Sequence, residues 1–267
     1  MSIGLSQVAG TPRDETGRLS AVMVSERTKH DKGSDKSRTY VIGDIHGRLD
    51  LLDPMVDLIS RDIEVNPVAD CLTVTIGDYI DRGPDSRGVL DRLARNPFPT
   101  RFIALKGNHE ALFEAFLADP SVGERWRRLG GLETLHSYRV PVRQLMVGKN
   151  YEESSKALRE AVTQEHFMFL ASLKKSMTLG RYFLCHAGVR PGIPLDRQSE
   201  EDLLWIRNSF LTSRADFGKI IVHGHTPTER PEIWPNRINI DTGAFATGRL
   251  TCVVLEDQSE PRFLSTE

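Results

Sequence analysis

The stretch "CLTVTIGDYIDRG", residues 71–83, joins an apolar run directly to a polar one. The apolar half, through Ile76, is typical of a buried strand. The polar half places Asp78 and Asp81 just after that strand. Ligands of open α/β sheets bind outside the carboxyl ends of the strands. The stretch therefore predicts a buried strand with candidate ligand-binding side chains at its carboxyl end.

The same order of strand and helix recurs on both sides of this stretch. Apolar runs at 39–44 and 101–108 also end in polar residues, and helical spacing is found at 49–63, 84–95 and 109–118. Strands that alternate with helices predict a largely parallel, buried sheet in an α/β protein. The last third of the chain returns to strands, at 181–186, 219–224, 237–241 and 249–256.

Three regions divide the chain. Residues 1–37 are polar, charged and aperiodic, which predicts a flexible N-terminal tail. Either an inert extension or a regulatory docking segment fits that composition. Residues 38–262 form the expected folded domain, and about 124–173 within it are expected to be a helical insertion beside the sheet.

Composition narrows the class of protein. The 267 residues are 39% hydrophobic and 27% charged, which is ordinary for a globular protein. A net charge of −2 gives no overall attraction to nucleic acid or to a membrane surface. The sequence has neither an apolar run long enough to span a membrane nor the pattern of a signal peptide, so we expect a cytoplasmic protein. The cysteines are far apart and are expected to be reduced packing residues: Cys71, Cys185 and Cys252.

Polar side chains with metal-binding chemistry follow five of the expected strands. They are Asp44 and His46, Asp78 and Asp81, Asn108 and His109, His186, and the pair His223 and His225. Each signal alone is weak, because an Asp after a strand often caps the next helix and a lone histidine can be a hydrogen-bonded core residue. Together, mixed oxygen and nitrogen ligands suit manganese, iron or zinc better than magnesium or calcium.

Five short blocks resemble, in order, those of the PPP-type serine/threonine protein phosphatases, bacterial-type members of the calcineurin-like metallophosphoesterase superfamily. The blocks are GDIHG (43–47), GDYIDRG (77–83), GNHE (107–110), HAG (186–188) and GHTP (224–227). The resemblance covers most of the chain after residue 37. It implies a single α/β domain with a central β-sandwich of mixed sheets flanked by helices.

The resemblance also implies a site for two divalent metal ions, most simply manganese, with iron or zinc as alternatives. Asp44 and His46 would hold the first ion and Asp78 would bridge both. The second ion would be held by Asn108, His186 and His225.

The block GHTP separates His223 from His225. Both histidines of Gly-His-x-His bind metal in the wider superfamily, but here Pro227 stands at the second position. His225 is therefore the expected ligand, and His223 is expected to pack nearby.

A mechanism follows from the same resemblance. A hydroxide that bridges the two metals would attack phosphorus directly, and His109, oriented by Asp81, would protonate the leaving oxygen. Arg82 and Arg207 would bind phosphate oxygens together with Asn108, since the planar guanidinium matches two oxygens. An Arg82–Asp81 ion pair is the alternative for the first arginine.

The expected activity is hydrolysis of phosphoserine and phosphothreonine in proteins or peptides, with small phosphoesters as further substrates in vitro. Hydrolysis of diadenosine polyphosphates on the same site is the main alternative, and an inactive scaffold is a third. Glu110 in GNHE favours the protein phosphatases slightly. Asp241 is expected either to support the site or to form a turn. Neither nucleic acid nor a membrane is an expected partner.

Overall fold

The computed structural model describes residues 37–143, 145–257 and 259–266. The expected N-terminal tail lies outside these residues, except for Ser37, which begins the first strand. Within the described residues, every helix is too short or too polar to traverse a bilayer.

The first sheet has the strand order β10-β9-β1-β2-β3. Its strands are β1 (Ser37–Ile42), β2 (Asp70–Thr75), β3 (Arg101–Ala104), β9 (Thr251–Glu256) and β10 (Arg262–Ser265). β1, β2 and β3 pair in parallel, as their alternation with helices predicts. β9 runs antiparallel to both β1 and β10, so the sheet is mixed. β10 extends three residues past the expected end of the domain at residue 262.

The second sheet has the order β4-β5-β6-β8-β7. Its strands are β4 (Ser176–Leu179), β5 (Tyr182–Cys185), β6 (Ile220–His223), β7 (Glu232–Trp234) and β8 (Arg237–Asn239). The three central strands are parallel and the two edge strands are antiparallel. The expectation of two mixed sheets flanked by helices is therefore confirmed.

The two sheets pack face to face through alternate residues of their strands, because successive side chains point to opposite faces. Val41 of β1 and Leu184 of β5 belong to one buried cluster between the sheets. Their neighbours point outward instead: Tyr40 packs in the cluster that includes α1, and Cys185 packs in the cluster beside α8 and α9. Cys185 is fully buried there, facing away from the inner face of its sheet.

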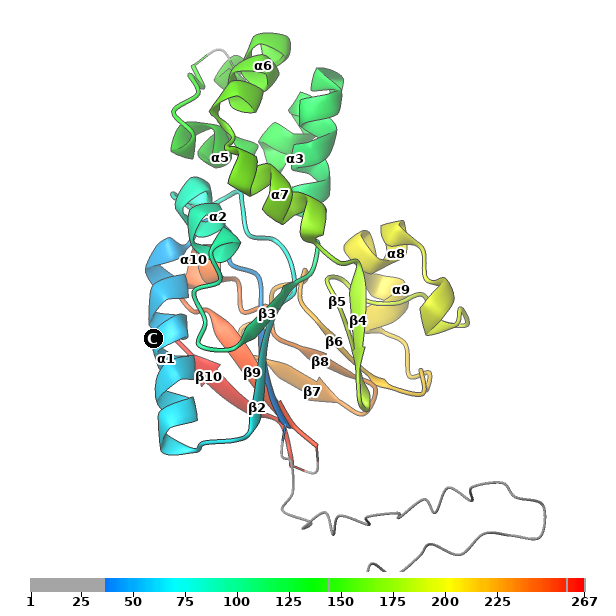
Figure 1. The fold of residues 1–267 in the computed structure, drawn as a ribbon. Coiled ribbons are helices and arrows are strands. Elements are labelled where there is room, and N and C mark those ends of the chain that lie inside the picture. Colours follow the sequence, from blue (N-terminus) through cyan, green and yellow to red (C-terminus); the bar gives the residue numbers. More distant parts are fainter. Residues whose placement is uncertain (1–36, 144, 258, 267) are drawn as a thin grey trace, which may run out of the picture. The chain divides into compact units, whose positions relative to one another are not determined.

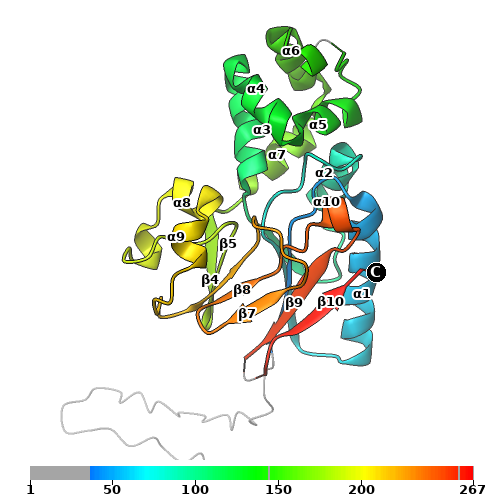
Figure 2. The same cartoon turned by 180° about the vertical axis from the view of Figure 1, so that it is seen from behind.

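Helices cover the outer faces of the sandwich (Figures 1 and 2). α1 (Leu49–Val65) lies along the first sheet, and α8 (Glu200–Trp205) and α9 (Asn208–Leu211) lie beside the second. Smaller elements are α2 (Ser86–Ala94), α10 (Ala244–Thr247) and the single turns Pro120–Val122, Leu145–Val147 and Leu195–Arg197.

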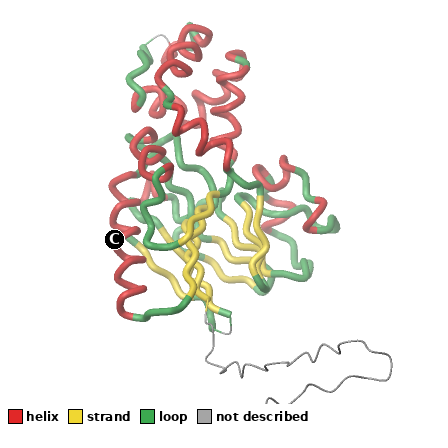
Figure 3. Tube along the Cα trace, in the orientation of Figure 1, coloured by secondary structure: helices red, strands yellow, loops and turns green. Residues whose placement is uncertain are grey.

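A group of helices gathers beyond the carboxyl ends of β1, β2 and β3 (Figures 1 and 3). It consists of α3 (Asn108–Ala118), α4 (Gly123–Trp126), a π-helical turn (Arg127–Gly131), α5 (Leu132–Ser137), α6 (Tyr151–Ala161) and α7 (Gln164–Ser172). These helices sit on the same side of the sandwich as the loops that follow β1, β2 and β3.

Candidate metal centre

The loops after the strands have an unusual backbone. Five non-glycine residues in them have positive φ: His46 (48°), Asp78 (54°), Asp81 (71°), Arg82 (68°) and His225 (66°). This left-handed conformation costs about 1–2 kcal/mol per L-residue and is rare outside glycine. Such residues cluster at functional sites, where the surrounding structure holds them in place. The strained backbone therefore costs local stability, but it orients the side chains of these loops.

Glycines allow these loops to touch through their backbones. Gly77 has φ 104°, and a Cβ atom placed on it would lie 2.5 Å from the amide nitrogen of Gly107. A Cβ atom on Gly83 would collide with the carbonyl oxygen of His46. Only glycine fits this close approach. The three blocks around positions 46, 78 and 108 are thus packed into one unit.

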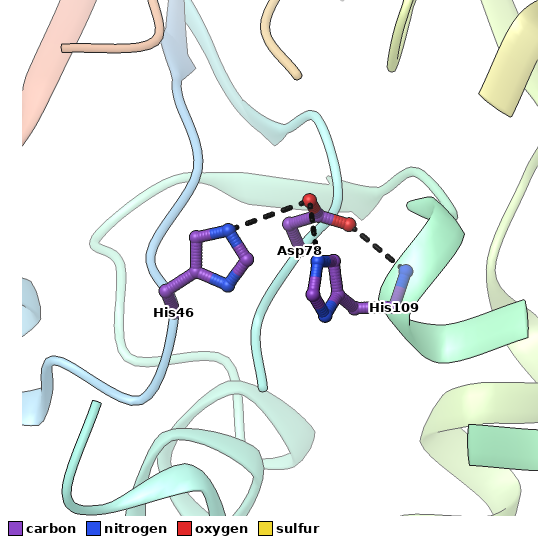
Figure 4. A group of neighbouring side chains, drawn as sticks. All are labelled: His46, Asp78 and His109. Atoms are coloured by element: carbon purple, nitrogen blue, oxygen red, sulfur yellow. Dashed lines mark hydrogen bonds and ion pairs between the residues drawn. The ribbon is translucent and has the colours of Figure 1, made fainter. Parts of the chain in front are cut away.

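One cluster of buried side chains joins His46, Asp78 and His109 (Figure 4). The Nε2 atoms of His46 and His109 lie 3.5 and 3.8 Å from Oδ2 of Asp78. The backbone N–H of His109 donates to the other oxygen, Oδ1, at 3.1 Å. The carboxylate of Asp78 is therefore held between the loop after β1 and the start of α3.

A second buried cluster joins Asp78, His186 and His225. Nε2 of His186 lies 3.4 Å from Oδ1 of Asp78 and 3.2 Å from Nδ1 of His225. Asn108 lies against the same atom, with its Oδ1 2.8 Å from Nε2 of His186. Asp78 thus belongs to both clusters, with Oδ2 toward the first and Oδ1 toward the second.

Backbone carbonyls fix the ring orientation of two of these histidines. Nδ1 of His46 lies 2.8 Å from the oxygen of Ile80, and Nδ1 of His186 lies 3.0 Å from the oxygen of Ile76. A carbonyl only accepts, so Nδ1 carries the hydrogen and Nε2 faces Asp78. Metal-binding histidines are commonly oriented in this way. Nε2 of His225 is buried and has no hydrogen-bond partner among the described residues.

The charges in this region favour a cation. Burial raises the pKa of Asp44, and the nearby carboxylates of Asp241 and Asp78 raise it further. Burial lowers the pKa of His46 to about 3. Buried carboxylates so close together repel one another unless positive charge lies between them. The donors, their burial and their charge all fit divalent metal ions.

Asp44 lies beside the two clusters but in neither of them. Its carboxylate accepts the backbone N–H of His225, at 3.0 Å to Oδ2 and 3.3 Å to Oδ1. Asp241 forms a turn, since its Oδ1 accepts the N–H of Gly243 at 2.8 Å. Its carboxylate also raises the pKa of Asp44, and a role in supporting the site stays a prediction.

His109 also contacts Asp81 and Arg82. Its Nδ1 lies 2.6 Å from Oδ2 of Asp81, and its Nε2 lies 3.3 Å from Nη2 of Arg82. Burial alone would lower the pKa of His109, but the carboxylates of Asp78 and Asp81 outweigh it and raise that pKa overall. The Arg82 guanidinium stacks on Phe245, 4.6 Å from the ring centroid. Among the described residues, Arg82 forms no ion pair with Asp81.

Arg207 lies on the other side, next to the second cluster. Its Nη1 donates to Oγ1 of Thr226 at 3.3 Å, and Thr226 follows His225 in the chain. Trp205 meets the ring of His225 edge to face at 6.2 Å, and Arg125 of α4 stacks on Trp205 at 4.5 Å. Neither Phe245 nor Arg125 was singled out from the sequence, because neither belongs to a recognisable block.

The pair His223 and His225 separates because β6 ends between them. His223 is the last residue of the strand, and its ring packs against Phe210 with centroids 5.0 Å apart. His225 has a left-handed backbone and turns toward His186 instead. The two-residue periodicity of a strand does not extend past its end.

Glu110 has a structural position that the sequence did not reveal. Its carboxylate accepts backbone N–H groups of Asp78 (2.9 Å), Tyr79 (2.8 Å) and Gly107 (2.9 Å). Burial, together with Asp78, raises its pKa to about 7. Glu110 therefore ties the loop after β2 to the start of α3.

We expect Glu110→Ala to lower the free energy of unfolding by at least about 3 kcal/mol, because each buried donor left unpaired costs about 1–3 kcal/mol. Urea unfolding measures this loss. Glu114→Ala, on the same helix but half exposed and paired with Lys106, is the control and should change stability little. Equal stability of the two variants would contradict the role of Glu110.

These features define the class of the protein as a metal-dependent phosphoesterase. Its framework is a two-sheet sandwich, and buried histidine clusters linked by a carboxylate lie at the strand ends. The chain belongs to the calcineurin-like phosphoesterase family, whose model matches residues 37–250.

Relatives of the chain carry two kinds of name. "Serine/threonine-protein phosphatase 2" of Escherichia coli is 28% identical over 79% of this chain and 90% of its own length. "Bis(5'-nucleosyl)-tetraphosphatase PrpE [asymmetrical]" of Anoxybacillus flavithermus is 27% identical over 80% of this chain and 88% of its own length. A solved structure of a candidate diadenosine tetraphosphatase matches with a TM-score of 0.58 and 19% identity, covering 87% of this chain and 95% of that one.

Proposed function

We propose that this protein is a two-metal phosphomonoesterase that removes phosphate from phosphoserine and phosphothreonine in proteins. The observation that carries the proposal is the sharing of Asp78 by two buried clusters, with the His109–Asp81 pair beside it. The proposed ligands of the first ion are Asp44, His46 and Asp78, and those of the second are Asp78, Asn108, His186 and His225.

The cations supply chemistry that the side chains lack. When bound, two divalent ions, for which we propose manganese, lower the pKa of water and offset the negative charge of a phosphate group. Asp78 offers one carboxylate oxygen toward each cluster, which suits a bridge between two cations.

The remaining residues bind the ester and protonate its leaving group. In our proposal His109 gives the proton on Nε2 to the leaving oxygen, while Asp81 holds the ring through Nδ1. Arg82, whose Nη2 is 3.3 Å from that Nε2, would bind a phosphate oxygen at the same place. Arg207 would bind from the side of His225. General acid help of this kind is worth about 10²–10⁴-fold in rate.

A second candidate function has its own support. Hydrolysis of dinucleoside polyphosphates requires binding of bases as well as of several phosphates. Two half-buried aromatic rings border the clusters, Phe245 beside His46 and Trp205 beside His225. An arginine stacks on each ring, Arg82 on Phe245 and Arg125 on Trp205. This pattern is compatible with stacked bases and polyphosphate, as the name of the Anoxybacillus relative also suggests.

Substrate competition separates the two functions. The protein is loaded with manganese, and kcat/KM is measured for a phosphoserine peptide, a phosphothreonine peptide and diadenosine tetraphosphate. We expect the peptides to be preferred. Preference for the dinucleotide would replace the proposed substrate class, and a protein that holds two manganese ions yet hydrolyses none of the three would contradict the enzyme proposal.

Metal content tests the assignment within HGHTP. His225→Ala should bind one manganese ion fewer than the unmodified protein, because the proposed second site loses a nitrogen ligand. His223→Ala should keep the full content, since that ring faces Phe210. Elemental analysis after dialysis gives both numbers. The reverse result, a loss in His223→Ala alone, would show that the assignment is wrong.

A further inference from the structure

The carboxylate of Asp81 receives two hydrogen bonds besides the one from His109. The indole N–H of Trp126 donates to Oδ2 at 2.8 Å, and the hydroxyl of Thr134 donates to Oδ1 at 2.5 Å. The N–H of Asp81 in turn points at Oγ1 of Thr134, 2.9 Å away, and at Oγ of Ser86, 3.0 Å away. All of these side chains are at least 99% buried.

Both donors come from the group of helices beyond the sheets. Trp126 ends α4 and Thr134 lies in α5. Between them, the carbonyl of Gly130 accepts the N–H of Arg82 at 3.1 Å. Gly130 has φ 107°, and a Cβ atom there would lie 2.7 Å from the Arg82 nitrogen. The segment from 126 to 134 therefore holds the Asp81–Arg82 backbone as well as the Asp81 carboxylate.

We propose that Trp126 and Thr134 are positioning residues for His109 and act on it through Asp81. This inference rests on the proposed function, in which His109 protonates the leaving oxygen. A carboxylate bonded only to His109 could rotate about its Cβ–Cγ bond, and the imidazole would follow it. Donors on both oxygens remove that freedom. A general acid must lie within hydrogen-bond reach of the atom it protonates, so a loss of orientation is a loss of rate.

Packing offers a competing explanation that the variants must exclude. Trp126 also packs against Phe113 and Phe116, with ring centroids 5.9 and 4.7 Å away. Trp126→Phe keeps an aromatic ring there and removes the N–H. Thr134→Val keeps the shape of the side chain and removes the hydroxyl.

Matched controls lie away from the clusters. The indole N–H of Trp234 donates to Oε2 of Glu232 at 3.2 Å, so Trp234→Phe removes a partly buried indole–carboxylate bond at the sheet edge. The hydroxyl of Thr73 bonds that of Thr100 at 2.7 Å, so Thr73→Val removes an equivalent buried hydroxyl.

The kinetic test compares two leaving groups. p-Nitrophenolate leaves without protonation, whereas the phenolate of phenyl phosphate needs a proton. We expect Trp126→Phe and Thr134→Val each to lower kcat for phenyl phosphate about tenfold, a part of the full general-acid effect, with kcat for p-nitrophenyl phosphate changed less than about twofold. The two controls should leave both rates unchanged. An equal loss on both substrates, or no loss on either, would overturn the proposal.

A spectroscopic test does not require turnover. In protein labelled with ¹⁵N-histidine and loaded with diamagnetic zinc, because manganese would broaden nearby signals, the Nδ1–H resonance of His109 is assigned by its absence in His109→Asn. We expect this resonance to shift or broaden in Trp126→Phe and Thr134→Val but not in the two controls. An unchanged resonance in both variants would overturn the positioning role. If the unmodified protein hydrolysed neither ester, the proposed function would fail, while the resonance would still decide the inference.

Discussion

Asp78→Asn should lose both metal ions and, with them, turnover. Asp78 is the one residue shared by the two clusters, and it directs a separate oxygen to each. An amide offers one oxygen and no negative charge, so neither cation keeps its bridging ligand. Removal of a residue that only hydrogen-bonds to a metal ligand typically lowers metal affinity about 10–100-fold, and we expect Asp78→Asn to lower manganese affinity by more than that.

The backbone at this position makes the substitution a clean one. Asp78 has φ 54°, and asparagine is among the few residues that tolerate the left-handed region. Its size also matches that of aspartate, so we expect the fold to persist. Metal content after dialysis against manganese and thermal unfolding of the metal-free protein measure the two effects separately. Asp57→Asn, at an exposed position of α1, is the control. Two ions retained in Asp78→Asn would disprove the bridge.

The sequence predicts those parts of the fold that have strong local patterns. β1, β2 and β3 are apolar runs followed by amphipathic helices, and their parallel order follows from that alternation. β4, β7 and β10 were not predicted: each has only three or four residues at a sheet edge and, unlike β3, none is followed by an amphipathic helix. A three-residue segment such as "EIW" becomes a strand only through its pairing with β8. That pairing depends on tertiary structure, and the local sequence contains no pattern that predicts it.

The candidate site divides in the same way. The side chains proposed to bind metal stand at strand ends in short blocks, so their proximity in the fold could be predicted. The residues that hold those side chains in position could not be predicted. Thr134 is 53 positions from Asp81 in the chain, and Trp126 is 45 positions from it. Neither follows a strand or belongs to a block, and a helix of ordinary composition does not disclose which carboxylate it contacts.

The structure gives His109 two conceivable roles. It belongs to the cluster with His46 and Asp78, and a carboxylate on its Nδ1 would also suit a metal ligand. Arg82 decides for the acid in our proposal. Its guanidinium lies 3.3 Å from Nε2 and would repel a doubly charged metal ion at that nitrogen. A phosphate ester there would be attracted by it instead. The guanidinium also opposes the single charge of a protonated ring, but the carboxylates of Asp78 and Asp81 outweigh that effect and raise the pKa of His109 overall.

His109→Asn should therefore keep both metal ions and lower kcat by about 10²–10⁴-fold on phenyl phosphate, because the amide cannot supply an acidic proton. The bond from the residue 109 backbone N–H to Asp78 does not involve the side chain, so the proposed bridging carboxylate stays in place. Elemental analysis and steady-state kinetics on phenyl and p-nitrophenyl phosphate check the two halves, with exposed His136→Asn as the control. If His109→Asn lost a metal ion, His109 would be a metal ligand. If its kcat were unchanged, another group would have to protonate the leaving oxygen. Retained metal combined with a loss concentrated on the poorer leaving group is the result that only a general acid at this position explains.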